Sequence, residues 1–233
     1  MLGSTTKSAY LRGVKDGLPF IIVAAPFATL FGVLGTEAGF NLAQVMSFSL
    51  LVIAGAAQFT AVQLMVDNAP TVMVLATSLA VNMRMAMYSA ALTPHLGGAS
   101  LPWRMLVAYY NVDQSYAMSV QRYEENPTLG MGQKLGYFFG TITPLAPAWY
   151  GFTLVGALAG SAIPPEFGLD FAMPITFLAM IGPVLKTLPH VLAAVTSVVV
   201  ALFLVDVPFG IGLLVAGLMA MAVGAEAERR MQR

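Results

Sequence analysis

The sequence predicts an all-α membrane protein, a polytopic bundle of about eight transmembrane helices. Its 233 residues are 58% hydrophobic and only 9% charged, whereas a soluble domain carries about 25% charged residues. Several apolar stretches reach the roughly 20 residues that cross the hydrocarbon core of a bilayer. None shows the residue-by-residue alternation of a membrane β-barrel. Because no linker or shift in composition divides the chain, we expect one transmembrane domain over residues 1–233.

Eight segments are candidate spans. The sixth and seventh are short and flanked by prolines, so one of them could be broken or re-entrant, which leaves seven spans as an alternative. Residues 1–17 are basic and resemble the start of a signal peptide, but the apolar run that follows is too long for one and lacks a clear A-x-A cleavage site. The expected spans are 18–36, 43–66, 70–92, 104–120, 135–159, 171–186, 190–206 and 208–225.

Lysine and arginine predict the orientation, because cytoplasmic loops carry an excess of both. With a cytoplasmic N-terminus, only Arg104 falls outside, and Arg84 lies within the membrane. We therefore expect both termini in the cytoplasm, with residues 1–17 and the tail 226–233 exposed there. The basic residues on that side are Lys7, Arg12, Lys15, Arg122, Lys134, Lys186, Arg229, Arg230 and Arg233.

A short echo indicates a possible internal repeat. "TLFGVLG" at residues 29–35 in the first span resembles "TLVGALA" at residues 153–159 in the fifth. Many transporters are built from repeated bundles, so a four-plus-four duplication is a possible origin. Chance similarity between Gly- and Ala-rich helices is the alternative.

Two charges are predicted to meet deep in the membrane. Arg84 lies fourteen residues after Pro70, about 21 Å along a helix, and Asp113 lies at a similar depth if residues 104–120 cross in the opposite direction. A charge at the bilayer centre costs about 2.5–3.5 kcal/mol on insertion scales, and such residues usually pair and mark a functional site. We therefore expect an Arg84–Asp113 pair or a shared hydrated cavity; a purely structural pair is the alternative.

Polar residues on neighbouring spans extend this site. Asn82 and Tyr88 flank Arg84, Gln58 lies in the second span, and Tyr109, Asp113 and Tyr116 share one helical face of the fourth span. Proline and glycine mark possible helix breaks, because freed carbonyls at membrane depth are tolerated only beside protein or water. The candidate break or hinge residues are Gly55, Pro144 and Pro147.

Several function classes find no support in the sequence. The chain has no cysteine and two histidines, and it contains neither H-E-x-x-H nor G-x-S-x-G, so we expect no metal site, no cofactor and no enzymatic activity. A formal net charge of zero, with no basic face, argues against a nucleic-acid partner.

The segments "AGAAQF", "NMRMAMYSAALTPH", "WR" and "VDQSYA" resemble the AzlC-type branched-chain amino acid permeases. The resemblance covers most of the chain, and its most specific part is Asn82-x-Arg84 followed by Tyr88 and Asp113. It implies a multi-pass exporter of valine, leucine and similar amino acids in the bacterial inner membrane, together with a small AzlD-type membrane partner. Gln114 departs from the acidic residue that is more usual in the family, which leaves Asp113 as the candidate proton carrier.

An aliphatic amino acid needs a cation for its carboxylate and acceptors for its ammonium group. Arg84 suits the carboxylate, because guanidinium and carboxylate form paired hydrogen bonds. The candidate residues that would orient the rest of the substrate are Asn82, Gln58, Tyr109 and Tyr88. A proton or ion channel and the permease subunit of an ATP-driven amino acid importer remain as alternatives.

Overall fold

The computed structural model describes residues 5–160, 185, 187–207 and 211–231, and every regular element in these ranges is helical. The chain divides into two compact units, residues 1–58 with 82–165 and residues 59–81 with 166–233. Each is described by itself. The all-helical prediction is confirmed for the described residues. The prediction of a single domain stays a prediction, because helices α4 and α5 each run from one unit into the other.

The first span is longer than its apolar core. Helix α1 (Thr6–Gly17), a 3₁₀ turn η1 (Leu18–Phe20) and α2 (Ile21–Glu37) follow one another without a gap and give a 32-residue helical stretch. Thr5 caps its start by accepting a 3.2 Å hydrogen bond from the backbone of Ser8. The predicted N-terminal segment 1–17 is therefore largely helical and continuous with the first span.

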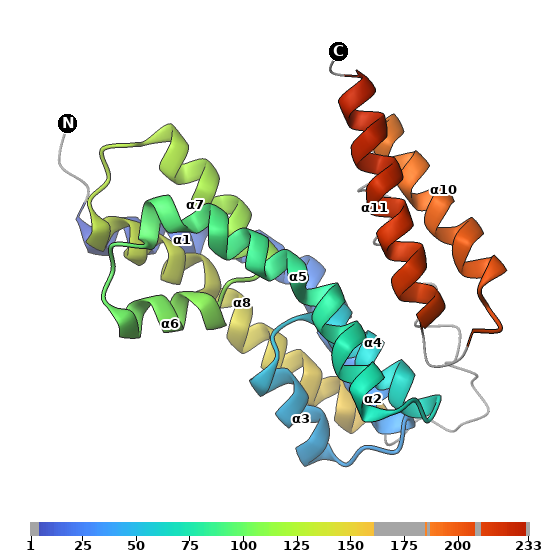
Figure 1. Ribbon diagram of the computed structural model, residues 1–233. Coiled ribbons are helices and arrows are strands. Elements are labelled where there is room, and N and C mark those ends of the chain that lie inside the picture. Colours follow the sequence, from blue (N-terminus) through green and yellow to red (C-terminus); the bar gives the residue numbers. More distant parts are fainter. Residues whose placement is uncertain (1–4, 161–184, 186, 208–210, 232–233) are drawn as a thin grey trace. The chain divides into compact units, whose positions relative to one another are not determined.

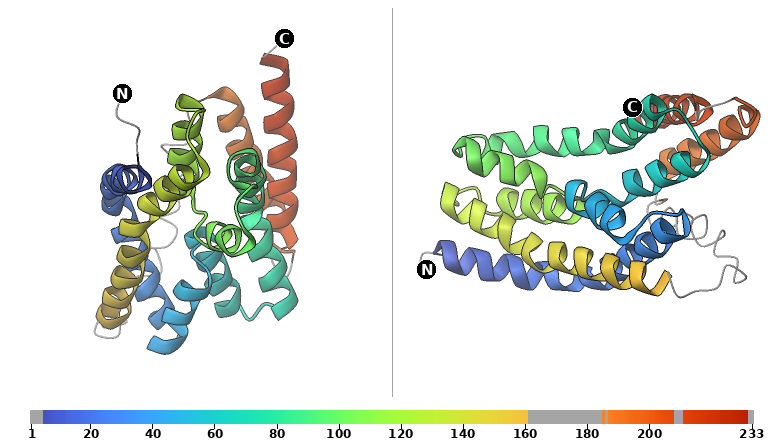
Figure 2. Two further views of the ribbon diagram at one scale, coloured as in Figure 1. Left: turned by 90° about the vertical axis from the view of Figure 1, so that its left-hand side faces the viewer. Right: turned by 90° about the horizontal axis from the view of Figure 1, so that it is seen from below.

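Helix α8 (Met131–Gly160) packs against α1 and α2 along most of its length. Both stretches run in the same direction: Gly13 lies against the backbone of Tyr137, and Gly32 lies further along, against the backbone of Thr153. Figure 2 shows the blue α1–α2 and the yellow α8 side by side. Because glycine has no side chain, the two backbones approach closely, as is typical of helix contacts in membranes.

The echoing segments "TLFGVLG" and "TLVGALA" meet in this contact. Gly32 lies on the carbonyl of Thr153, and Gly156 lies in the same way on the carbonyl of Thr29. The contact is therefore reciprocal, as in a local two-fold arrangement. A duplication of the whole chain stays a prediction.

The second predicted span, 43–66, is interrupted. Helix α3 (Leu42–Leu51) begins at Asn41, which forms a capping box with Gln44. Residues 52–54 are not helical, and α4 (Gly55–Val66) follows. Gly55 thus lies directly after a break. Helix α8, in contrast, continues through Pro144 and Pro147, so the prediction of a helix break at these prolines is wrong. Their missing backbone bonds leave the rest of the 30-residue helix intact.

The fourth predicted span, 104–120, is also interrupted, and its two halves form a hairpin. Helix α6 (Leu101–Tyr109) and α7 (Asp113–Glu125) are separated by residues 110–112. They are 9 and 13 residues long, about 14 and 20 Å at 1.5 Å per residue. Neither can cross a hydrocarbon core of about 30 Å.

We call the end of the first unit that contains Thr6 the Thr6 end. The α6–α7 hairpin both begins and finishes there. Helix α5 (Thr71–Leu96) reaches this end: a methyl group added to Gly98 would lie 3.3 Å from the side chain of Met131 at the start of α8, and one added to Gly132 would lie 3.0 Å from the side chain of Thr6. His95 contacts the ring of Tyr123 near the end of α7. Figure 1 shows α6 beginning and α7 ending on the left, where α1 and α8 begin.

The hairpin corrects two predictions. Residues 104–120 do not form a single crossing; they enter and leave the first unit at one end. Arg104, three residues into α6, therefore lies at the Thr6 end rather than on the opposite side. Arg104 is therefore no longer an exception to the bias of basic residues toward one side. Apart from Arg84 in the middle of α5, the basic residues of the first unit lie on helices that meet at the Thr6 end. They are Lys7, Arg12, Lys15, Arg104, Arg122 and Lys134.

In the second unit, α10 (Leu188–Phe203) and α11 (Ile211–Met231) pack on each other, and a methyl group added to Gly224 would lie 3.2 Å from the side chain of Ala193. The predicted span 171–186 falls almost entirely outside the described residues. Four helical stretches in the described part are long and apolar enough to cross a membrane, Thr6–Glu37, Thr71–Leu96, Met131–Gly160 and Ile211–Met231. The predicted count of eight spans and the orientation of the termini are not confirmed.

Candidate functional site

Arg84 and Asp113 form the predicted ion pair. The Nη1 atom of Arg84 lies 3.0 Å from Oδ2 of Asp113, and the two side chains are 34% and 42% exposed. Arg84 is near the midpoint of α5, about 18–20 Å from either end of that helix. Asp113 reaches this level because it is the first residue of α7 at the tip of the α6–α7 hairpin.

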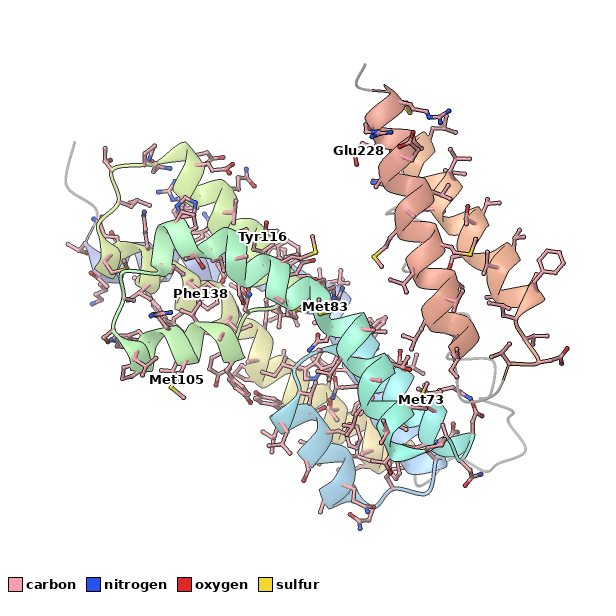
Figure 3. The ribbon with its side chains drawn as sticks, in the orientation of Figure 1. Met73, Met83, Met105, Tyr116, Phe138 and Glu228 are labelled. Atoms are coloured by element: carbon pink, nitrogen blue, oxygen red, sulfur yellow. The ribbon has the colours of Figure 1, made fainter. Side chains whose placement is uncertain are left out.

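Tyr88, one turn after Arg84 on α5, donates a 2.9 Å hydrogen bond to the second oxygen of Asp113. Its ring stacks on Tyr116 of α7, with centroids 4.1 Å apart and an angle of 10° between the planes; Tyr116 is marked beside α5 in Figure 3. Both carboxylate oxygens of Asp113 are therefore held from α5. The partial positive charge of a helix N-terminus also favours a carboxylate in the first turn of α7.

The hairpin tip that carries Asp113 is internally bonded. The buried hydroxyl of Ser115 accepts a 2.9 Å hydrogen bond from the backbone N–H of Val112 and lies 2.9 Å from the carbonyl of Tyr110. Asn111 donates a 3.2 Å hydrogen bond to Ser89 of α5. Irregular backbone at membrane depth requires such partners. Asn111 and Ser115, which sequence reasoning missed, therefore hold Asp113 in place.

Polar atoms of both Arg84 and Asn82 are unsatisfied. Nε of Arg84 and Oδ1 of Asn82 are buried and have no hydrogen-bond partner among the described residues. Buried polar atoms are rarely left unpaired, and each exception calls for an explanation such as water or a ligand. Nε of Arg84 is a free donor and Oδ1 of Asn82 a free acceptor, which are the kinds of group that bind a carboxylate and an ammonium group.

Gln58 and Tyr109 belong to a second polar cluster, at the break between α3 and α4. The hydroxyl of Tyr109 donates to the carbonyl of Leu50 and lies 3.2 Å from the hydroxyl of Tyr150. The predicted shared face of Tyr109 with Asp113 does not exist, because the helix ends between them. The spacing rule used for that prediction holds only in an unbroken helix.

Gln58 lies inside this second cluster. It donates a 3.3 Å hydrogen bond to Ser49, which lies 3.1 Å from Thr153 of α8. All three side chains are buried. Ser49, Thr153 and Tyr150 were missed from sequence. In the sequence, each of these three residues is marked only as a hydroxyl side chain among apolar neighbours.

The structure thus separates the predicted binding residues into two groups. Arg84 and Tyr88 bind Asp113 at the α6–α7 tip, Asn82 lies two residues before Arg84 on α5, and Gln58 and Tyr109 lie at the α3–α4 break. The roles assigned to all of them stay predictions. The described residues contain no group of three or more His, Cys, Asp or Glu side chains that could hold a metal ion.

Comparison with known proteins identifies the family. The model of the AzlC protein family matches residues 19–163. A membrane protein of Archaeoglobus fulgidus, described as uncharacterized, is 32% identical over 85% of this chain and 86% of its own length. The inner membrane protein YgaZ of Escherichia coli is 25% identical over 77% and 73% of the two chains, and a Helicobacter pylori membrane protein, also described as uncharacterized, is 28% identical over 73% and 75%.

No solved structure matches the chain. The family match covers both interrupted helices and the Arg84–Asp113 pair, and the relatives named above are membrane proteins. This chain is therefore a membrane protein of the AzlC family.

Proposed function

We propose that this chain is a secondary-active exporter of branched-chain amino acids in the bacterial inner membrane, coupled to protons and assisted by a small AzlD-type membrane protein. Family membership and the membrane-protein relatives support a transport protein in general terms. The observation that carries the finer proposal is the Arg84–Asp113 pair at the tip of a helical hairpin, in which Nε of Arg84 is left unsatisfied.

The pair offers a direct way to couple a proton to a carboxylate substrate. While Asp113 is ionised, its Oδ2 occupies Arg84. In this state an amino acid from the cytoplasm can bind between the two groups, with its carboxylate on Arg84 and its ammonium group on Asp113. A proton from outside that neutralises Asp113 then weakens the bond to the ammonium group and releases the amino acid there, and loss of this proton inside restores the original pair.

The surrounding residues suit the rest of such a substrate. Nε of Arg84 supplies a donor to the carboxylate, and Oδ1 of Asn82 supplies an acceptor to the ammonium group. Tyr88 holds Asp113 through its other oxygen, so that carboxyl group stays in position while its bond to Arg84 opens. The hairpin that carries Asp113 is a short segment packed on α5 and α8, which is an element that can move between two positions.

The test is efflux from cells loaded with a valine- or leucine-containing dipeptide. Cells with this chain and its neighbour-encoded partner should export the free amino acid in a saturable way, and collapse of the proton gradient should stop export. Asp113→Asn should reduce driven export at least 100-fold, because the amide cannot carry the proton. Asp67→Asn is the matched control, since Asp67 is exposed and bonds only Gln63 among the interactions described.

Export that persists in Asp113→Asn would remove this carboxylate from the mechanism. Non-saturable flux would indicate a channel, and dependence on a co-purifying ATPase would indicate the importer subunit. Full export by this chain without its partner would contradict the two-component proposal.

A further inference from the structure

The break between α3 and α4 exposes a backbone carbonyl. In a continuous helix the carbonyl of Leu50 would accept the N–H of Ala54, but residues 52–54 are not helical. The hydroxyl of Tyr109 donates to this carbonyl instead. The C-terminus of a helix carries a partial negative charge of about half an electron, so the end of α3 attracts a cation.

A buried network of side-chain oxygens begins at the residue before Leu50. Ser49, the neighbour of Leu50, is 3.1 Å from Thr153 and accepts from Gln58 at 3.3 Å. Gln58 is 1% exposed, and its Oε1 has no partner among the described residues. If the Gln58 amide were flipped, Oε1 would accept from the Ser49 hydroxyl, but Nε2 would then have no partner. A buried amide with one unsatisfied end calls for a bound water or ligand.

The chemistry of the cluster limits what that ligand can be. All of its acceptors are neutral oxygens, from a carbonyl, an amide and hydroxyl groups. Ca²⁺ sites include carboxylates and Mg²⁺ keeps carboxylates and waters, and neither kind of site occurs among these buried groups. Broken transporter helices bind small monovalent cations through freed carbonyls and helix C-termini.

We propose that the α3–α4 break is a site for a small monovalent cation, held by the Leu50 carbonyl, Gln58 Oε1 and the Ser49 and Thr153 hydroxyl oxygens. Na⁺ and a primary ammonium group share this chemistry. The ammonium source, an amino acid that places its ammonium group here instead of at Asn82, rests on the proposed function; the Na⁺ source does not.

Tyr109 occupies the site in the absence of the cation. Its hydroxyl donates to the carbonyl of Leu50, which the cation would also use, so binding of the cation releases Tyr109 from Leu50. Tyr109 is the last residue of α6, immediately before the tip that leads to Asp113. The cation therefore weakens one contact that holds the α6–α7 hairpin, which links this site to the Arg84–Asp113 pair.

The experiment measures the unfolding temperature of the purified full chain in lipid nanodiscs. One arm compares NaCl with KCl and choline chloride at equal ionic strength and without amino acid. The other compares valine with 2-hydroxy-3-methylbutanoate, which lacks the ammonium group, in choline chloride. A ligand that binds only the folded chain raises this temperature as its concentration exceeds Kd.

We expect a selective rise with NaCl, with valine, or with both, and the arm that responds identifies the source. Gln58→Met keeps the length of the side chain and removes its oxygen, so it should weaken the response at least tenfold in ligand concentration. Gln63→Met, on the exposed part of the same helix, should leave the response unchanged. Ser49→Ala provides a second variant if Gln58→Met does not fold.

The site would be overturned if the unfolding temperature of the wild-type chain rose in neither arm. It would also be overturned if the Gln58→Met and Ser49→Ala variants both kept the full rise. Valine export from cells, measured separately, distinguishes the two proposals. If export is present and both arms are flat, only the cation site fails. If export is absent, the proposed function fails and the NaCl arm still decides the site.

Discussion

The first unit contains two kinds of helix that differ in continuity and in polarity. The α1–α2 stretch and α8 run without interruption for 32 and 30 residues and meet through glycines. The α3–α4 and α6–α7 segments stop and restart, and most of the buried polar residues described in the first unit lie on them, whereas Thr141 and Thr153 lie on α8. Tyr109 at one interruption bonds Leu50 at the other, so the two breaks meet.

This contrast divides the first unit into a rigid scaffold, the continuous helices, and a part that can change conformation, the interrupted segments. Close backbone contact leaves little room for the continuous helices to shift against each other. The interruptions are held by individual hydrogen bonds, such as Asn111 with Ser89 and Tyr109 with Leu50, which can exchange with water or substrate at small net cost. Segments that move during function are drawn from the less stable parts of a fold. We therefore assign conformational change to the hairpin tips and rigidity to the glycine contact.

The largest expected effect concerns the hairpin geometry and is all-or-none. The chain has no cysteine, so single cysteines can be introduced into it without further changes. Ser100→Cys, before α6, and Thr128→Cys, after α7, should react with an impermeant thiol reagent from the same side of the membrane. Ala38→Cys, after α2, should react from the other side. Reaction of Ser100→Cys and Thr128→Cys from opposite sides would restore the single crossing and contradict the hairpin.

The next effect tests the scaffold. Gly156→Ala places a methyl group against the backbone carbonyl of Thr29, and a backbone cannot move aside as a side chain can. Overpacking of this kind costs about 1–3 kcal/mol, so the unfolding temperature of the purified chain should fall.

Gly151→Ala is the matched control on the same helix, since nothing lies within 4 Å of its added methyl group. Alanine is favoured over glycine in a helix by up to about 1 kcal/mol, so this variant should be neutral or slightly more stable. Equal stability of the two variants would show that the glycine contact does not hold the scaffold.

The scaffold could be predicted from sequence because its signals are local. Long apolar runs predicted α1–α2 and α8, and the "TLFGVLG" and "TLVGALA" segments proved to be the ones that meet. The depth estimate predicted the Arg84–Asp113 pair correctly, although it assumed that residues 104–120 form a single crossing. Asp113 reaches mid-depth whether residues 104–120 cross the membrane or turn back at their middle.

The interruptions could not be predicted by the same means. Prolines were the expected signal, yet α8 continues through Pro144 and Pro147, while the breaks at 52–54 and 110–112 contain no proline. These breaks are stabilised by contacts between distant residues, such as Asn111 with Ser89 and Tyr109 with Leu50. Hydropathy measures only composition, so two short apolar helices joined by a turn look like one span.

The smallest expected effect concerns the ion pair itself. Its two side chains are about a third or more exposed, so we expect a coupling free energy of about 1 kcal/mol rather than the larger value of a fully buried pair. Arg84→Gln should destabilise the chain more than the double variant Arg84→Gln with Asp113→Asn, because the single change leaves a carboxylate without its cation. Tyr88 would still bond that carboxylate and limit the loss.

Thermal unfolding of the wild type, the two single variants and the double variant gives the coupling directly. Purely additive losses would mean that the 3.0 Å contact contributes nothing to stability. A near-zero coupling together with complete loss of export in Asp113→Asn is also informative. It would mean that the pair is retained for proton exchange, since a weak bond between Arg84 and Asp113 is one that a substrate carboxylate can replace.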